Sequence, residues 1–323
     1  MVCLRDIFDV SKTFPNADID YDCYMSAPVG TKLPSGKCYK LLKSLYGLKQ
    51  AARLWNKLLT SFLLSLGMSQ CISDTCLFYH ATGQDLTIVC IYVDDILIAS
   101  TSDTIMHDLN TKFNDRFKTT DMGRVQWILG MNVFTSDDRK MIQLSSARYV
   151  QTILDRANAN HFSTSPVPFH PNLKLSKEMC PKTDEEKAFM ADIPYRTIIG
   201  MLLYLMVSSR PDIAYAVCTC ARYMDCPGKE HWNAVCGILK YLKGTIDLRI
   251  TYSSTIASSH PILHGYSDAD WAANDLDTRH SHTGYVFYLS NGPIVWKSCL
   301  QSSISLSSMD SEYYSMDMQL RKC

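Results

Sequence analysis

Two apolar runs of the kind that forms β-strands flank a pair of adjacent carboxylates. Residues 78–99 are rich in β-branched and aliphatic side chains, and Asp94 and Asp95 interrupt them. Neighbouring like charges repel and Asp is disfavoured in strands. The pattern therefore predicts two strands joined by a tight hairpin, with both carboxylates at its tip. Other strands are expected at 7–10, 125–134, 141–144, 262–267, 283–290 and 293–298.

Apolar residues at helical spacing predict most of the remaining elements. Residues 51–66 have such a pattern, in which Trp55 lies on the apolar side and is expected in the core, and Gly67 is a stop signal. Further helices are expected at 105–113, from a Ser146 cap onward, and from Asp310 onward. Four more are expected at 185–191, 195–208, 211–224 and 229–243. The apolar run 201–207 is too short to cross a bilayer, which indicates a buried helix rather than a membrane span.

The mixture of strand and helix patterns predicts an α+β protein. Its 323 residues are enough for two or more domains. Residues 163–181 contain four prolines and no regular period, a composition typical of a linker.

Charge is balanced overall but uneven along the chain. Lys and Arg number 32, as do Asp and Glu, yet no acidic residue occurs between residues 23 and 73. This stretch is either a solvated surface or a surface that follows phosphates. The acidic residues are expected to cluster elsewhere. The basic residues of the stretch are Lys32, Lys37, Lys40, Lys43, Lys49, Arg53 and Lys57, and the acidic clusters are Asp18, Asp20, Asp22 and residues 268–277.

The thirteen cysteines predict free thiols in a reducing compartment, because the sequence has no signal-peptide pattern and their number is odd. The Cys spacings lack a matched second half, which argues against structural zinc.

Several motifs together carry a family resemblance. Residues 92–95, Tyr-Val-Asp-Asp, resemble the catalytic hairpin of reverse transcriptases, and residues 8–14 resemble the strand with the upstream carboxylate. Residues 42–55 are similar to the long template- and nucleotide-contacting motif of copia-type LTR-retrotransposon Pol polyproteins. Segments 195–200, 209–214 and 241–245 resemble the connection of that family, and residues 265–272 resemble the first strand of its ribonuclease H domain. The motifs occur in family order and span nearly the whole chain.

This resemblance implies an order of domains. Residues 1–120 would form the palm-type sheet with packed helices, without the fingers subdomain. Residues 121–181 would form a thumb-like segment and linker, and 182–260 a helical connection. Residues 261–323 would form the N-terminal part of a ribonuclease H-like α/β domain.

The resemblance also implies RNA-directed DNA synthesis by two-metal nucleotidyl transfer. Asp9 and Asp94 would bind Mg²⁺, with Asp95 assisting. Phe14 would exclude a ribose 2′-hydroxyl, although a core aromatic is an equal alternative. The residues expected to approach nucleotide or template are Gly47, Lys49, Gln50 and Arg53. The partners implied are an RNA and DNA template-primer and deoxynucleoside triphosphates, with no membrane. The implied location is the cytoplasm or cytoplasmic virus-like particles, with the nucleus as an alternative.

The ribonuclease H resemblance is incomplete. Asp268 and Glu312 match the first two of the usual four acids, and the other two would lie beyond Cys323. The family's fingers would precede Asp9. The chain also departs from the family at Pro15, Ala17, Ala52 and Asp310.

We therefore expect little or no activity from this chain alone. The alternatives are a non-catalytic nucleic-acid-binding relic and a partial gene model of a complete, active polyprotein.

Overall fold

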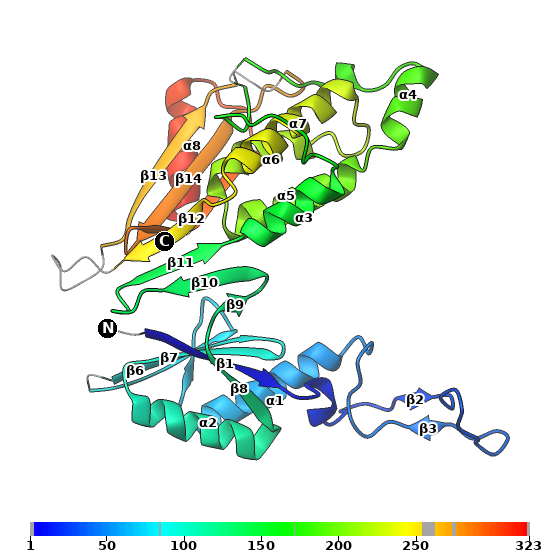
Figure 1. Ribbon diagram of the computed structural model, residues 1–323, viewed down its shortest axis with the longest axis vertical. Helices are drawn as coiled ribbons and strands as arrows, with labels where there is room; N and C mark the ends of the chain where they lie inside the picture. Colours follow the sequence, from blue (N-terminus) through cyan, green and yellow to red (C-terminus); the bar gives the residue numbers. More distant parts are fainter. Residues whose placement is uncertain (1–2, 84, 171, 254–261, 273–275, 322–323) are drawn as a thin grey trace. The chain divides into compact units, whose positions relative to one another are not determined.

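The computed structural model describes residues 3–83, 85–170, 172–253, 262–272 and 276–321 (Figure 1). The chain forms two compact units, Met1–Ile128 and Leu129–Cys323, which we call unit 1 and unit 2. Both contain helices and antiparallel strands, so the α+β expectation is confirmed. The finer division into four domains stays a prediction.

An antiparallel sheet with the strand order β4-β5-β6-β7-β1-β8 forms the centre of unit 1. The strands expected at 7–10 and 78–99 are present, whereas β8 had no clear signal in the sequence. The bounds are β1 (Cys3–Val10), β4 (Ser69–Gln70), β5 (Leu77–Thr82), β6 (Asp85–Tyr92), β7 (Asp95–Ser100) and β8 (Thr119–Arg124).

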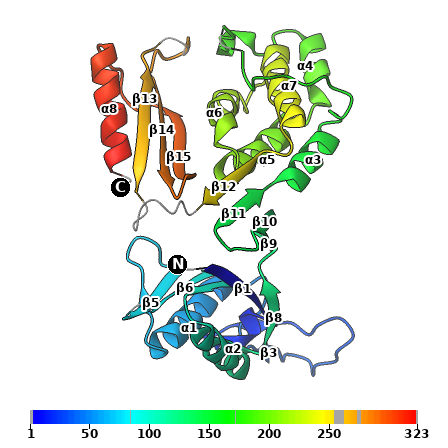
Figure 2. The ribbon, with the colours of Figure 1, turned by 60° about the vertical axis from the view of Figure 1, so that its left-hand side comes forward.

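Helices α1 (Ala51–Ser65) and α2 (Asp103–Phe117) cover one face of this sheet (Figure 2). Phe8 and Ile96 point into the core beneath them, and both are fully buried. Helix α1 ends where expected, because Gly67 adopts a φ of 81° that an L-residue rarely takes. Trp55 is 2% exposed, which confirms its expected place in the core.

The rest of unit 1 is a two-stranded extension and two short elements. Strands β2 (Tyr24–Met25) and β3 (Tyr39–Lys40) pair with each other outside the main sheet. The short elements are the 3-10 helix η1 (Phe14–Asn16) and β9 (Trp127–Ile128). Pro15 fits at the start of η1, where no helical hydrogen bond needs its missing N–H. Ala17 has an ordinary φ of −87°, so this position does not need glycine.

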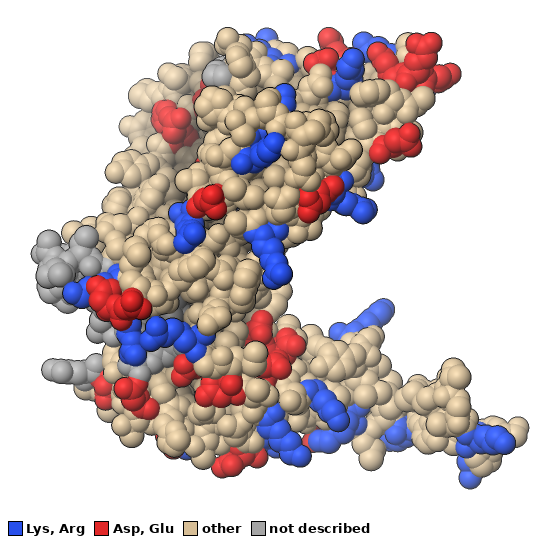
Figure 3. Space-filling view, in the orientation of Figure 1, with Lys and Arg blue, Asp and Glu red and all other residues tan. Residues whose placement is uncertain are grey.

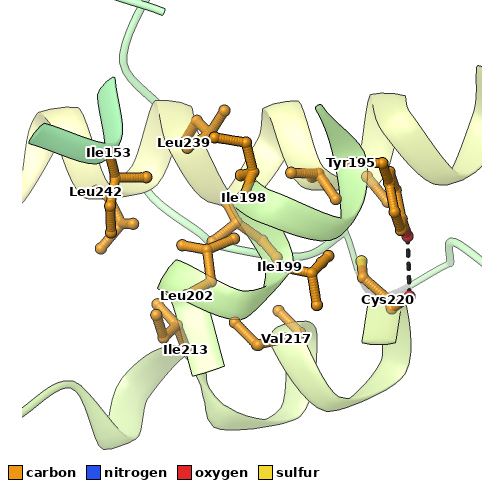
Figure 4. Close-up of a cluster of buried hydrophobic side chains, with 14 of the residues drawn as sticks. Ile153, Tyr195, Ile198, Ile199, Leu202, Ile213, Val217, Cys220, Leu239 and Leu242 are labelled. Carbon is orange, nitrogen blue, oxygen red and sulfur yellow. Dashed lines mark hydrogen bonds between the residues drawn. The ribbon is translucent and has the colours of Figure 1, made fainter. Parts of the chain in front are cut away.

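A helical core stabilises much of unit 2 (Figure 4). Ile198, Leu202, Val217, Leu239 and Leu242 meet in it and are fully buried. The run 201–207 does lie in a helix, but that helix is only partly buried: Leu202 and Leu205 are fully buried, whereas Tyr204 and Val207 are 45% and 67% exposed. The helices expected from their apolar period are all present. Their bounds are α3 (Ala147–Arg156), α4 (Asp184–Ala191), α5 (Tyr195–Ser208), η3 (Pro211–Ile213), α6 (Ala214–Ala221) and α7 (Lys229–Gly244).

Two sequence expectations in unit 2 were wrong. Segment 163–181 is not an unpacked linker: Leu175 is 2% exposed and lies in the helical core, and η2 (Lys177–Met179) adds a helical turn. The apolar side chains of this segment pack against the helical core, although its prolines prevent a regular helix. The Ser146 side chain does not cap α3 but hydrogen-bonds the hydroxyl of Ser209 at 2.6 Å.

Strands β10 (Met131–Thr135), β11 (Met141–Ser145) and β12 (Arg249–Ser253) form an antiparallel sheet beside these helices. The single strand expected at 125–134 was wrong. Leu129 and Gly130 have φ values of 48° and 75°, and this left-handed backbone separates β9 from β10.

The last part of unit 2 is the antiparallel sheet β13-β14-β15 with helix α8 against it. The bounds are β13 (His264–Asp270), β14 (His282–Leu289), β15 (Gly292–Leu300) and α8 (Ser308–Leu320). The helix starts as expected: Ser307 accepts a hydrogen bond from the Asp310 N–H, and Asp310 accepts one from the Leu306 N–H.

None of the described helices is by itself long and apolar enough to cross a membrane. The pair α4 and α5 meets that test only jointly, with a 52° bend between them.

Candidate active site

The two adjacent carboxylates lie at the tip of a tight hairpin, as the sequence predicts. Tyr92 on β6 pairs with Asp95 on β7, so Val93 and Asp94 form the turn between them. Val93 has a φ of 55°. A β-branched residue seldom adopts this conformation, and such strain often occurs at functional sites.

The hairpin brings Asp95 beside Asp9, although the two are distant in sequence. Asp9 on β1 is the ladder partner of Asp95, and the Val10 N–H donates a hydrogen bond of 3.2 Å to the Asp94 carbonyl. Residues directly opposite in a sheet point to the same side. Phe8 and Ile96 point into the core, so Asp9 and Asp95 share the opposite face of the sheet.

The carboxylates affect one another electrostatically. The pKa of Asp95 is raised, first by partial burial and then by the negative charges of Asp94 and Asp9. A cation between these groups would relieve that repulsion. The three acidic residues thus form one electrostatic cluster at an accessible edge of the hairpin.

Helix α1 supports the hairpin from the core side. The indole N–H of Trp55 donates a hydrogen bond of 2.6 Å to the carbonyl oxygen of Val93. The Trp55 ring also packs edge-on against Phe117 with ring centroids 5.2 Å apart. Sequence reasoning placed Trp55 in the core but missed its contact with the turn. The only signal was its position on α1, and helical periodicity does not reveal what a side chain contacts.

The donor chemistry of the cluster suits a hard divalent cation. Among the described residues, no group of three or more His, Cys, Asp and Glu side chains is arranged to hold a metal ion. Mg²⁺, however, is commonly bound by one or two carboxylates together with water and substrate phosphates. Asp9 and Asp95, which face the same side on adjacent strands, fit such a site.

The residues expected to contact nucleotide or template occupy the segment before α1 and its first turn. Phe14 is half-buried and packs edge-on against Tyr46 at a centroid distance of 4.7 Å. Gly47 has a φ of 92°, which explains the glycine. Lys49 and Gln50 are exposed. Among the described hydrogen bonds and ion pairs, none joins these four residues to the carboxylate cluster.

The basic stretch is partly neutralised, which corrects the expectation that the carboxylates lie elsewhere. Lys43 pairs with Asp18 at 2.6 Å, and Lys40 pairs with Asp22 at 2.6 Å. Arg53 binds both carboxylate oxygens of Asp20 at 3.1 Å. The chain brings the acidic and basic segments together because they form the two arms of the β2–β3 extension and the start of α1.

Four cations of the stretch remain without an ion pair among the described contacts. Basic side chains are visible at the tip of the β2–β3 extension, at the lower right of Figure 3. The four residues are Lys32, Lys37, Lys49 and Lys57, and all are exposed.

A second pair of acidic residues lies on neighbouring elements of unit 2. The Glu312 carboxylate on α8 accepts a hydrogen bond of 3.4 Å from the N–H of Ala269, the residue after Asp268 on β13. The Ser315 hydroxyl donates a hydrogen bond of 2.9 Å to the Asp268 carbonyl. The two acids expected to act together therefore lie on adjoining elements.

Comparison with known proteins gives a consistent picture. The family described as reverse transcriptase (RNA-dependent DNA polymerase) matches residues 4–171. The chain is 40% identical over 308 residues to the "Retrovirus-related Pol polyprotein from transposon TNT 1-94" of Nicotiana tabacum, which covers 94% of this chain and 23% of that protein. It is 36% identical over 311 residues to the corresponding polyprotein of transposon RE1 of Arabidopsis thaliana, covering 95% of this chain and 20% of that protein.

A third relative has a similar length. The "Putative transposon Ty5-1 protein YCL074W" of Saccharomyces cerevisiae is 29% identical over 309 residues, covering 94% of this chain and 96% of that protein. The chain thus spans less than a quarter of the two plant polyproteins that it matches.

Proposed function

Because the chain belongs to the reverse transcriptase family of copia-type retrotransposon Pol polyproteins, we propose that unit 1 is the polymerase palm. Its reaction is RNA-directed DNA synthesis on a template-primer, with deoxynucleoside triphosphates as substrates. The observation that supports this most is the ladder pairing of Asp9 with Asp95, beside a turn that carries Asp94.

In this proposal Asp9, Asp94 and Asp95 hold Mg²⁺. Two bound metal ions would activate the primer 3′-hydroxyl and stabilise the leaving oxygen. The chain's own contribution is placement: β1 and β7 fix the carboxylates by their register, and Trp55 holds the turn between β6 and β7. Phe14 excludes a ribose 2′-hydroxyl, and Gly47, Lys49, Gln50 and Arg53 approach the nucleotide or template.

Metal binding tests the proposal most directly, because it is the step that the carboxylates perform themselves. We expect Mn²⁺ titration followed by electron paramagnetic resonance to show binding by the wild type that Asp9→Asn and Asp95→Asn weaken at least tenfold. Asp137→Asn removes an exposed carboxylate of unit 2 and should have no effect. Equal Mn²⁺ affinity in all four proteins would overturn the assignment.

Primer extension by the same proteins tests the reaction. From the sequence we expect little or no synthesis by this chain alone. Any synthesis that does occur should disappear in Asp94→Asn. Synthesis that persists in this variant would show that the carboxylate cluster is not the catalytic site.

A second candidate function is nucleic-acid binding without catalysis. The four exposed lysines without described ion pairs favour it, because cations on one segment attract phosphates without reading bases. The affinity for oligo(dT) should then fall steeply with salt, and Lys32, Lys37, Lys49 and Lys57 changed to Gln should flatten this dependence. Binding that is indifferent to salt would exclude the candidate.

The sheet β13-β14-β15 with α8 is, in our proposal, the first part of a ribonuclease H-like domain. The contact of Glu312 with the strand that carries Asp268 supports it. If the two acids share a metal, Asp268→Asn and Glu312→Gln should each weaken a Mn²⁺ site that Asp95→Asn leaves intact. A titration in which neither variant alters Mn²⁺ binding would contradict this.

A further inference from the structure

Three aspartates follow one another at every second position before β2. Asp18, Asp20 and Asp22 lie on the arm that precedes β2, and this arm bends at residues 20–21. Backbone hydrogen bonds join it to the returning arm on both sides of the bend, from the Ile19 N–H to the Leu42 carbonyl at 3.1 Å and from the Leu41 N–H to the Cys23 carbonyl at 2.9 Å. The arm thus carries three negative charges within five residues, and we call Asp18, Asp20 and Asp22 the aspartate row.

Each aspartate of this row holds a different cation. Lys43, Arg53 and Lys40 pair with Asp18, Asp20 and Asp22 in that order, at 2.6, 3.1 and 2.6 Å. The cations come from the opposite arm and from α1, so the pairing is built by the fold and not by sequence neighbours. The pKa of the Lys40 ammonium is raised by its hydrogen bond to Asp22 and by the charge of that carboxylate.

All three pairs are open to solvent. The exposed fractions of the side chains lie between 41% and 82%. Exposed ion pairs typically contribute about 0–1 kcal/mol to stability. A phosphate that approaches from solvent can therefore replace any of these carboxylates at small cost.

The paired cations share the segment with lysines that have no ion pair among the described contacts. Lys32 and Lys37 precede the paired Lys40 and Lys43, whereas Lys49 and Lys57 flank the paired Arg53. Arg53 and Lys57 are four residues apart and share one side of α1. A polyanion on this surface could therefore contact cations of both kinds.

We propose that Asp18, Asp20 and Asp22 compete internally with a nucleic-acid backbone for Lys43, Arg53 and Lys40. This inference rests on the proposed binding of nucleic acid by the same surface. The surface takes the phosphates of a single strand, and binding proceeds by exchange: phosphates occupy the cations while the released carboxylates return to solvent and gather counterions. The aspartate row therefore lowers the affinity for nucleic acid and makes that affinity less dependent on salt.

The main test removes the competitor and keeps the cations. The triple variant Asp18→Asn, Asp20→Asn, Asp22→Asn is titrated with fluorescently labelled oligo(dT) at several salt concentrations. Each freed cation that meets a phosphate of a single strand steepens the slope of log K against log salt by about 0.7. We expect a slope steeper by about 2 and an affinity at low salt higher by about tenfold or more.

A control with the same change in net charge separates local from general electrostatics. Asp108, Asp184 and Asp225 also form exposed ion pairs, with Lys112, Lys187 and Arg196. The triple Asn variant of these three residues should change the slope by much less than the first variant. If both triple variants behave alike while the wild type binds with salt dependence, the internal competitor is excluded and the proposed binding stands.

Two further variants distinguish the loss of the competing carboxylates from misfolding of the β2–β3 extension. Asp20→Asn frees only Arg53 and should steepen the slope by about 0.7. Adding Lys40→Gln, Lys43→Gln and Arg53→Gln to the triple Asn variant should remove the whole gain. If neither the wild type nor any Asn variant binds oligo(dT) at low salt, both the inference and the proposed nucleic-acid binding fail.

Discussion

The indole nitrogen of Trp55 lies 2.6 Å from the carbonyl oxygen of Val93 and donates a hydrogen bond to it. Trp55 is 2% exposed, so this bond joins the core of unit 1 to the turn that carries Asp94. Val93 has a φ of 55°, a strained conformation for a β-branched residue that persists only when its surroundings hold it. The hydrogen bond thus links the packing of α1 to the position of the carboxylates.

Trp55→Phe should therefore weaken both stability and metal binding. Loss of the donor leaves the Val93 carbonyl without its partner, which costs about 1–2 kcal/mol in unfolding free energy, and the turn relaxes away from its strained conformation. Denaturant unfolding and Mn²⁺ titration measure the two effects. Trp296→Phe is a matched control, because its indole also donates to a carbonyl, that of Met206, at 2.8 Å. It should cost similar stability and leave Mn²⁺ affinity unchanged; a Trp55→Phe protein with wild-type Mn²⁺ affinity would contradict the supporting role.

Asp95→Asn should stabilise the protein at neutral pH when no metal is present. The raised pKa of Asp95 means that the folded state binds more protons than the unfolded state between the ordinary pKa of Asp and the raised one. Stability is therefore lost as the pH rises through that window. The variant removes this loss, which solvent screening limits to about 1 kcal/mol or less.

Thermal unfolding between pH 4 and pH 7 measures the effect. The melting temperature of Asp95→Asn should change less with pH over this range than that of the wild type. Mg²⁺ should reverse the order by stabilising the wild type more than the variant, because a ligand stabilises the state that binds it. A variant less stable than the wild type at pH 7 without metal would show that repulsion among the carboxylates is not significant.

Gly47→Ala should destabilise unit 1 by about 1–2 kcal/mol. The backbone at Gly47 has a φ of 92°, in the left-handed region that a residue with a Cβ adopts only at a cost in energy. Space is not the obstacle, since nothing lies within 4 Å of a Cβ built there. Gly200→Ala is the control: this glycine lies in α5 with open space and an ordinary φ, and the change should stabilise by about 0.5–1 kcal/mol. Chemical denaturation compares the two, and equal effects would refute the backbone argument.

Arg210→Met should lower the free energy of unfolding by about 3 kcal/mol. Arg210 is 3% exposed, and its guanidinium binds both the carboxylate of Asp212 and the carbonyl and hydroxyl of Thr245. Its removal takes one donor from each of these groups at the junction of η3 with α7 and leaves Asp212 without its cation. Arg196→Met breaks an exposed pair with Asp225 and should cost less than about 0.5 kcal/mol. Differential scanning calorimetry should therefore show a large fall in melting temperature for the first variant alone.

Local patterns in the sequence were sufficient for most of the elements. The apolar period of α1, α5 and α7 and the runs that became β6 and β7 arise from the geometry of single elements, whose periods of 3.6 and 2 residues can be read from neighbouring positions. The turn at Asp94 followed for the same reason. The motifs around Asp9 and Asp94 also indicated the reverse transcriptase family, which the comparisons confirm. The Mg²⁺ cofactor and the cytoplasmic location stay predictions.

Tertiary structure alone decided which side chains meet. The register of β1 against β7 places Asp9 opposite Asp95, the return of the β2–β3 extension sets Asp18, Asp20 and Asp22 against the basic stretch, and the packing of α1 brings Trp55 to Val93. The sequence predicted that the acidic residues lie away from the basic stretch, because along the chain these acids are separated from the cations that neutralise them. Such contacts depend on how elements pack and on the register in which strands pair, and the period of an isolated segment contains no information about either.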